Sequence, residues 1–242
     1  MKKIKLFCLP HAGSSASIYI KWEKDIDDLI KLEPIELPGR GKRFNEKFCD
    51  NFSDMLEDTY NFIQQKLEKK PFALYGHSMG SLLAFELYYV IKQRLQVEPL
   101  HIFLSCCPPP HKLASRKKIH TLPDKKFIEE ILLYKGIPRD LVEDQELLNI
   151  FLPIFKADIK VFESYGLAIK KQKINNDVTV LYGKNDSSIN KYDIAQWQVY
   201  TGSNCFLYEF DGGHFLNIER STEVISLINS TLNKYLNNIG TR

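Results

Sequence analysis

The stretch Phe72-Ala73-Leu74-Tyr75-Gly76-His77-Ser78-Met79-Gly80 carries most of the information about the fold. Its first four residues form a short apolar run, which predicts a buried β-strand. The residues from 79 to 95 are mostly apolar and predict a well-buried helix. A very tight turn brings together the residues two places before and two places after its centre, so glycine is required at Gly76 and Gly80. The stretch therefore predicts a strand, a sharp turn centred on Ser78, and a helix.

The pentapeptide from Gly76 to Gly80 reads G-x-S-x-G, and in this setting it predicts the nucleophile elbow of an α/β-hydrolase fold. An elbow holds its serine in a strained backbone conformation, which projects the Ser78 hydroxyl above the sheet and aims the Met79 N–H beside it. The N-terminus of the following helix adds partial positive charge there. Ser78 is the candidate nucleophile, and the Met79 N–H is a candidate oxyanion donor. A glycine-rich turn with an incidental serine is the alternative.

Short apolar runs elsewhere in the chain predict the other strands of the sheet. Helical patterns over 52–67, 79–95 and 221–236 alternate with several of these runs. Strands that alternate with helices indicate a mostly parallel central sheet with helices on both faces. The six runs, each expected to be buried on both faces of the sheet, are residues 4–9, 34–37, 72–75, 100–105, 178–182 and 205–210.

Residues 108–172 interrupt this alternation, and a plain crossover needs far fewer residues. The segment begins with three prolines and continues with apolar residues at helical spacing around 127–132 and 147–155. The pattern resumes over 158–165 after Pro153 disturbs it. We interpret the segment as a helical lid inserted over the C-terminal edge of the sheet, within a single domain that spans residues 1–242. A small second domain with no catalytic role is the alternative.

A general base and an acid that orients it must accompany the serine, because a serine hydroxyl is a poor nucleophile until a base removes its proton. In this fold they follow in the order Ser, Asp or Glu, His. His214 fits the base, because it lies on a glycine-containing loop after the last predicted strand. Asp186 fits the acid, because it lies at the tip of the strand predicted over 178–182. Asp193, in a predicted helix, and Asp211, on the base's own loop, are rivals.

The loop after the first predicted strand is expected to supply the second oxyanion donor. It reads Pro10-His11-Ala12-Gly13-Ser14, and its small residues allow the backbone to approach a substrate closely. We assign the donor to the Ala12 N–H, with the His11 N–H as the next choice.

Composition excludes several other classes of protein. The 242 residues include 33 basic and 30 acidic side chains, a net charge of +3 that is too balanced to indicate nucleic-acid binding. No stretch reaches the roughly 18 apolar residues that span a bilayer, and the N-terminus lacks the apolar region and cleavage site of a signal peptide. We therefore predict no membrane partner and a cytoplasmic location. Five cysteines without C-x-x-C spacing predict reduced thiols, with no disulfide framework.

Together these features resemble the type II thioesterases, the free-standing editing hydrolases of nonribosomal peptide and polyketide assembly lines. The resemblance runs nearly end to end and rests on five motifs in order. These are Pro10-His11-Ala12-Gly13, Leu37-Pro38-Gly39-Arg40-Gly41-Lys42-Arg43, Gly76-His77-Ser78-Met79-Gly80, Leu152-Pro153-Ile154-Phe155-Lys156-Ala157-Asp158 and Gly212-Gly213-His214-Phe215.

Two positions depart from the family pattern. Ser14 stands where the family usually has a second glycine, so Ser14 must strain or shift the loop if that glycine has a positive φ. Ser81 replaces the commoner alanine after the elbow, and we expect little from that change.

The resemblance implies a substrate, an acyl group held as a thioester on the phosphopantetheine arm of a carrier protein. It implies that Ser78 attacks the carbonyl, that the N–H groups of Met79 and Ala12 stabilise the oxyanion, and that water releases a free acid. No metal or other cofactor is implied. The implied partners are acyl or peptidyl carrier domains of a synthase, and the chain is predicted to be a monomer.

Other functions remain open on the same fold. A carboxylesterase or lipase would act on oxygen esters, and a product-releasing thioesterase would cyclise or release a finished chain. A catalytically inactive hydrolase fold that acts as a binding protein is the alternative from a different class.

Overall fold

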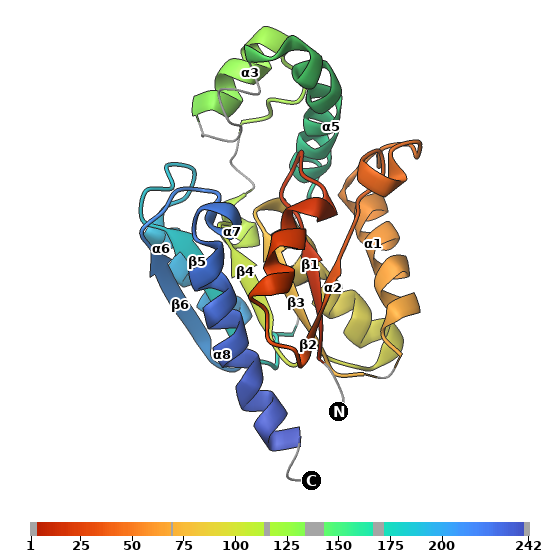
Figure 1. The fold of residues 1–242 in the computed structure, drawn as a ribbon. Helices are drawn as coiled ribbons and strands as arrows, with labels where there is room; N and C mark the ends of the chain where they lie inside the picture. Colours follow the sequence, from red (N-terminus) through yellow and green to blue (C-terminus); the bar gives the residue numbers. More distant parts are fainter. Residues whose placement is uncertain (1–3, 69, 114–116, 134–142, 167–171, 240–242) are drawn as a thin grey trace.

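Six strands form one sheet at the centre of the computed structural model (Figure 1). The structure describes residues 4–68, 70–113, 117–133, 143–166 and 172–239. The strand order is β2-β1-β3-β4-β5-β6, and within these residues every pairing is parallel. The parallel sheet flanked by helices that the sequence predicts is therefore confirmed.

The elements alternate between strand and helix along the chain. The strands are β1 (Ile4–Leu9), β2 (Ile30–Pro34), β3 (Phe72–His77), β4 (Ile102–Ser105), β5 (Val178–Gly183) and β6 (Cys205–Phe210). The helices are α1 (Phe52–Lys66), α2 (Met79–Leu95), α3 (Asp124–Leu133), α5 (Gln145–Glu163), α6 (Lys191–Ile194), α7 (Leu216–Glu219) and α8 (Ser221–Ile239). The described residues also form short 3-10 helices, which are η1 (Ala16–Lys24), η2 (Gly41–Arg43), η3 (Pro110–Lys112) and η4 (Ala195–Tyr200).

Alternate residues of the central strands face two different helical layers. Phe7 and Leu74 face a core built mainly with α1 and α2. Leu6 and Tyr75, one place along each strand, face a second core built with η1 and α8. This period of two follows from the pleat of a strand and explains why β1 and β3 are buried at every position.

The two edge strands depart from the sequence-based predictions. β2 covers 30–34, whereas the prediction placed it at 34–37. Lys31 and Glu33 interrupt its apolar pattern. Lys31 is exposed at this edge of the sheet, and the buried Glu33 pairs with Lys31 and Lys66. β6 has the predicted bounds, but its expected burial is wrong. Phe206, for example, is 42% exposed at the outer edge of the sheet.

Helices α3 and α5 stand beyond the carboxyl ends of the strands, at the top of Figure 1. They pack together through Phe127 and Phe155, whose ring centroids lie 6.3 Å apart. α5 continues through Pro153 as one helix, although the sequence suggested a disturbance there. Of the segment 108–172, residues 114–116, 134–142 and 167–171 lie outside the described residues. Among the described residues, no helix combines the length and hydrophobicity needed to cross a membrane.

Candidate active site

Ser78 occupies the predicted turn between β3 and α2 in a strained conformation. Its φ is 52° and its ψ is −117°, a region that residues with a side chain rarely adopt. A Cβ at Gly76 would overlap the carbonyl group of Gly80, and a Cβ at Gly80 would overlap the carbonyl group of Leu9. Both glycines are therefore required by close backbone contacts, as the sequence predicts.

Ser81 matters more to this turn than the sequence suggested. Its side chain is fully buried, and its Oγ accepts the Ser105 N–H at 2.9 Å. The same oxygen lies 2.7 Å from the Gly76 carbonyl oxygen and 2.8 Å from the Ser105 carbonyl oxygen. Ser81 thus connects the elbow to the end of β4, where an alanine would leave these backbone groups without that partner. These contacts argue against the expectation that this replacement has little effect.

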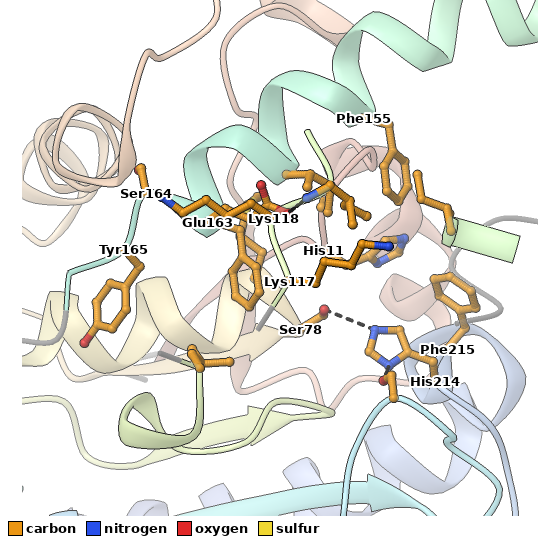
Figure 2. Close-up of a pocket in the computed structure, with 18 residues that line it drawn as sticks. His11, Ser78, Lys117, Lys118, Phe155, Glu163, Ser164, Tyr165, His214 and Phe215 are labelled. Atoms are coloured by element: carbon orange, nitrogen blue, oxygen red, sulfur yellow. Dashed lines mark hydrogen bonds between the residues drawn. The ribbon is translucent and has the colours of Figure 1, made fainter. Parts of the chain in front are cut away.

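The three side chains predicted to cooperate meet at the carboxyl end of the sheet. Figure 2 shows two of them, Ser78 and His214. His214 Nε2 lies 3.1 Å from Ser78 Oγ, and His214 Nδ1 lies 2.7 Å from Asp186 Oδ2. Asp186 follows β5, and His214 lies between β6 and α7. The His214 side chain is 14% exposed and that of Asp186 is fully buried. The serine hydroxyl therefore has a base within reach, and the base has an orienting carboxylate.

Hydrogen bonds keep the Asp186 carboxylate ionised. Burial alone would raise the pKa of Asp186, but the hydrogen bonds from His214 and Ser188 outweigh it and lower the pKa below its ordinary value. Ser188 donates to Asp186 Oδ1 from its hydroxyl at 2.6 Å and from its N–H at 2.9 Å. An ionised Asp186 favours the tautomer with the proton on Nδ1, which leaves His214 Nε2 free to accept a proton from Ser78.

Sequence reasoning missed Ser188, although a signal exists. A serine two residues after an aspartate is in place for a local turn in which the carboxylate accepts from the backbone. The rival acids contact other partners. Asp193 pairs with Lys112 at 3.0 Å, and Asp211 lies 3.8 Å from Arg220.

The loop proposed to carry the second oxyanion donor is not strained at Ser14. The positive φ of 79° belongs to Gly13, and Ser14 is absent from the described residues with positive φ. The Ser14 N–H instead donates to the His11 carbonyl at 3.1 Å. The serine in place of a second glycine therefore leaves the loop intact.

Ala12 and Met79, the residues predicted to supply the oxyanion donors, lie at the same site. Both residues line the same cavity as Ser78. Among the described residues, neither N–H donates to a protein acceptor. Met79 is the first residue of α2, where helical N–H groups have no partner within the helix. Two unpaired donors beside a candidate nucleophile are what an oxyanion site requires.

Two further histidines surround His214. The ring centroid of His77 lies 5.5 Å from that of His214, and the ring centroid of His11 lies 5.4 Å from that of His77. Burial, together with the neighbouring histidines, lowers the pKa of His77 well below its ordinary value. Burial and His214 lower the pKa of His11 to about 3. Both rings therefore stay neutral at physiological pH, and His77 is held by a 2.9 Å hydrogen bond to Ser105 Oγ.

Ser78, the candidate nucleophile, lines a cavity of about 750 Å³. This volume lies in the range typical of sites for small molecules. The sheet side of the cavity carries Ser78 and His214, and the opposite side is formed by the segment between β4 and β5 (Figure 2). Residues of that segment at the cavity are Leu113, Lys117, Lys118, Ile119, Ile131, Phe155, Ile159, Phe162, Glu163, Ser164 and Tyr165. The cavity is mostly apolar away from the reacting groups.

The donor atoms at this site do not suit a resident metal ion. The side chains of Cys106, Asp186 and His214 place their potential ligand atoms within 4.8 Å of one another. Burial raises the pKa of the Cys106 thiol well above its ordinary value, whereas metals bind the thiolate. Asp186 and His214 are already bonded to each other.

A parallel sheet with a strained serine on its elbow and a histidine and an aspartate at its carboxyl edge defines the α/β-hydrolase class. The model of the thioesterase domain family matches residues 4–232. The chain belongs to this thioesterase domain family.

Individual relatives agree with the family assignment. Gramicidin S biosynthesis protein GrsT of Aneurinibacillus migulanus is 33% identical over 226 residues, which are 93% of this chain and 88% of that protein. The medium-chain S-acyl fatty acid synthase thioesterase of Homo sapiens is 31% identical over 222 residues, or 90% and 83% of the two chains. The crystal structure of ClbQ from the colibactin NRPS/PKS pathway has a TM-score of 0.92 at 31% identity and covers 96% of this chain and 98% of that chain. The predicted resemblance is confirmed, and the protein is a thioester hydrolase.

Proposed function

We propose that this thioesterase removes acyl groups from the phosphopantetheine arm of carrier proteins and so clears aberrant or stalled chains in nonribosomal peptide or polyketide biosynthesis. The observation that carries the proposal is the 3.1 Å hydrogen bond between Ser78 Oγ and His214 Nε2 beside a cavity of about 750 Å³. The relatives from gramicidin S biosynthesis and from the colibactin pathway support this class of substrate.

In the proposed reaction Ser78 Oγ attacks the thioester carbonyl while His214 Nε2 takes the hydroxyl proton. Negative charge develops on the carbonyl oxygen and is stabilised by the N–H groups of Met79 and Ala12. The carbon–sulfur bond then breaks, the arm leaves as a thiol with the proton from His214, and the acyl group stays on Ser78. Asp186 stabilises the imidazolium throughout.

A water molecule completes the proposed cycle. His214 takes one proton from the water, whose oxygen attacks the acyl–Ser78 ester and forms a second oxyanion at the same donors. When this intermediate collapses, the proton returns from His214 to Ser78 Oγ and a carboxylic acid is released. The proposed steps use only side chains, backbone N–H groups and water, and no metal or other cofactor takes part.

We propose that residues 108–172 act as a lid within a single domain. Support comes from the cavity, whose sides come partly from the sheet and partly from α5 and the segments next to it. Movement of this segment would admit the arm of a carrier domain, and its return would exclude water from the acyl group. In this proposal the protein acts as a monomer, with carrier domains as transient partners.

Two model substrates with the same acyl group test the proposed chemistry. We expect kcat/KM for an octanoyl thioester of pantetheine to exceed that for the matching oxygen ester. A preference for the oxygen ester would support the carboxylesterase alternative instead. Comparison of acetyl and long peptidyl thioesters separates editing from product release, because an editing enzyme should accept short acyl groups.

A further inference from the structure

Helix α5 contacts the loop that presents the Ala12 N–H. The Gly13 N–H donates to Asp158 Oδ2 at 2.7 Å. Phe155, one turn earlier on α5, lies so close to Gly13 that a Cβ there would overlap its ring, and Figure 2 shows this ring directed from α5 toward the site. Two side chains of α5 therefore fix the residue that directly follows Ala12.

Arg40, from the Leu37–Arg43 motif, holds the other side of the same loop. Its Nη1 donates to the Ser14 carbonyl oxygen at 3.2 Å, and its Nε and Nη2 donate to the Pro38 carbonyl oxygen at 3.3 and 3.2 Å. The guanidinium also binds both carboxylate oxygens of Asp158, with Nη2 at 2.6 Å from Oδ1. The Arg40 side chain is 3% exposed and that of Asp158 is 1% exposed.

The charge of this buried pair suits its position. An isolated carboxylate close behind the loop would oppose the negative charge that develops on the substrate carbonyl. The bidentate guanidinium neutralises that carboxylate while leaving Oδ2 able to accept the Gly13 N–H. A buried ion pair generally adds little net stability to a protein. Stability alone therefore does not explain why this pair lies against the loop that carries Ala12.

We propose that Asp158 and Arg40 are positioning residues that set the oxyanion site and make it depend on the seating of α5. This inference rests on the proposed role of the Ala12 N–H. Asp158 fixes the Gly13 N–H and Arg40 fixes the Ser14 C=O, which together hold the loop on the C-terminal side of Ala12. If α5 moves away, Asp158 and Phe155 leave the loop together, and the oxyanion site is complete only when the helix is seated.

A positioning role of this kind has a specific kinetic signature. The oxyanion forms only after attack, so a displaced donor weakens the transition state and leaves substrate binding unchanged. Removal of one oxyanion donor typically costs about 100- to 1000-fold in kcat, and displacement should cost less. We expect kcat to fall about 10- to 100-fold while KM changes less than about threefold.

The double variant Arg40→Met/Asp158→Leu tests the proposal. Replacement of both members of a buried ion pair by apolar residues is often neutral for stability, so this protein should fold. Its kcat for octanoyl-pantetheine should fall as stated, and its affinity for an octyl trifluoromethyl ketone, which forms an oxyanion on Ser78, should fall by the same factor as kcat/KM. Wild-type kcat and inhibitor affinity in the folded variant would overturn the proposal, as would a loss confined to KM.

Lys160→Ala is the matched control. Lys160 lies on the same helix and pairs with Asp50 of the body at 3.0 Å, away from the loop. The Lys160→Ala variant should retain wild-type kcat and wild-type affinity for the trifluoromethyl ketone. An equal loss in Lys160→Ala would mean that any weakened contact of α5 has this effect, which would overturn the specific role of Asp158.

Two measurements on the wild-type protein, labelling of Ser78 and hydrogen exchange at Gly13, distinguish failure of this inference from failure of the proposed function. Failure of wild type to react with a fluorophosphonate at Ser78 would remove the proposed function itself, whereas normal labelling with unchanged variants removes only the positioning role. Hydrogen exchange of the Gly13 N–H can be measured in the wild-type protein, without any substitution. In the trifluoromethyl ketone complex this N–H should resist hydrogen exchange, and exchange as fast as that of an exposed loop would overturn the proposal even if the double variant failed to fold.

Discussion

Asp186 is bonded on both of its carboxylate oxygens. His214 Nδ1 lies at Oδ2, and Ser188 donates twice to Oδ1. The Ser188 hydroxyl also lies 3.1 Å from His214 Nδ1, so one serine contacts both members of the pair. The carboxylate is thereby fixed in orientation as well as in charge, and it can hold the imidazole in the tautomer that faces Ser78.

Substitution of Asp186 by asparagine should separate this role from simple packing. The amide nearly preserves shape but favours the wrong imidazole tautomer, and we expect kcat to fall about 1000- to 10,000-fold with KM little changed. Ser188→Ala leaves the carboxylate in place and should cost about tenfold or less. Steady-state hydrolysis of octanoyl-pantetheine measures both. An Asp186→Asn protein with more than a tenth of wild-type kcat would mean that another group orients His214.

Single residues could be predicted from sequence where chain order and motif fix them. Ser78, Asp186 and His214 follow the order that the fold imposes, and the structure brings them together. The partnership of Arg40 with Asp158 could not be predicted, although both residues lie in recognised motifs. Their positions are 118 residues apart, and only the packing of α5 over the first loop makes them neighbours.

At the scale of elements, one stripe of α5 faces the cavity. Phe155, Ile159 and Phe162 lie at spacings of four and three, so they share one side of the helix and line the cavity together. Leu147, two turns earlier than Phe155, is 43% exposed and does not line it. We therefore expect this side of α5 to set the depth available to an acyl chain.

Changes at Ile159 should shift the preferred acyl length. A larger side chain, in Ile159→Trp, should fill part of the cavity and favour acetyl over octanoyl groups, and Ile159→Ala should favour longer chains. One methylene of fit is worth about 1–3 kcal/mol in such a pocket, so shifts of tenfold or more are expected. The measurement is kcat/KM over thioesters of two to twelve carbons. Leu147→Ala is the control, and an unchanged profile in both Ile159 variants would place the acyl chain elsewhere.

The turn that carries Ser78 should tolerate no side chain at Gly80. Alanine there would collide with the backbone carbonyl of Leu9 in β1, which cannot move without disturbing the sheet. We expect Gly80→Ala to lower the free energy of unfolding by several kcal/mol or to prevent folding, as overpacking against backbone does. Gly166→Ala, which meets nothing within 4 Å, is the matched control. Urea denaturation of both proteins measures the difference, and equal stabilities would contradict the structure of the elbow.

Elements at the centre of the sheet could be predicted from sequence and those at its edges less well. β1 and β3 are covered on both faces, so the mostly apolar runs over 4–9 and 72–75 indicate them. β2 carries the exposed Lys31 and the buried, ion-paired Glu33, and these charged residues concealed the strand. Pro153 lies inside α5, where sequence alone could not show that the helix continues.

At the scale of the whole molecule, several histidines are buried in neutral form. His101 is 1% exposed and bonded to Thr179 at 2.8 Å, and burial lowers its pKa to about 4. His77 is fully buried and its pKa is lowered well below the ordinary value, also by burial. In the unfolded chain both would titrate near pH 6.5. The folded protein therefore resists protonation that the unfolded chain accepts.

This difference predicts a steep loss of stability in mild acid. Between about pH 6.5 and pH 4 the unfolded state binds more protons, so the free energy of unfolding falls as pH falls, by up to about 1.4 kcal/mol per pH unit for each histidine. His101→Gln should lower this slope by up to about 1.4 kcal/mol per pH unit, whatever its effect on stability at pH 7. Urea unfolding at pH 7, 6 and 5 measures the slope. The same slope in the variant would show that His101 does not stay neutral.

The most direct test of the central claim is hydrolysis of an acyl-loaded carrier protein, followed by intact mass, with wild type and Ser78→Ala in parallel. We expect wild type to release acetyl and other short acyl groups, so that the carrier mass falls by the acyl group alone and the phosphopantetheine arm remains. Ser78→Ala should leave the loaded carrier unchanged. A carrier that stays loaded with wild type, while a simple oxygen ester is still cleaved, would contradict the proposed function.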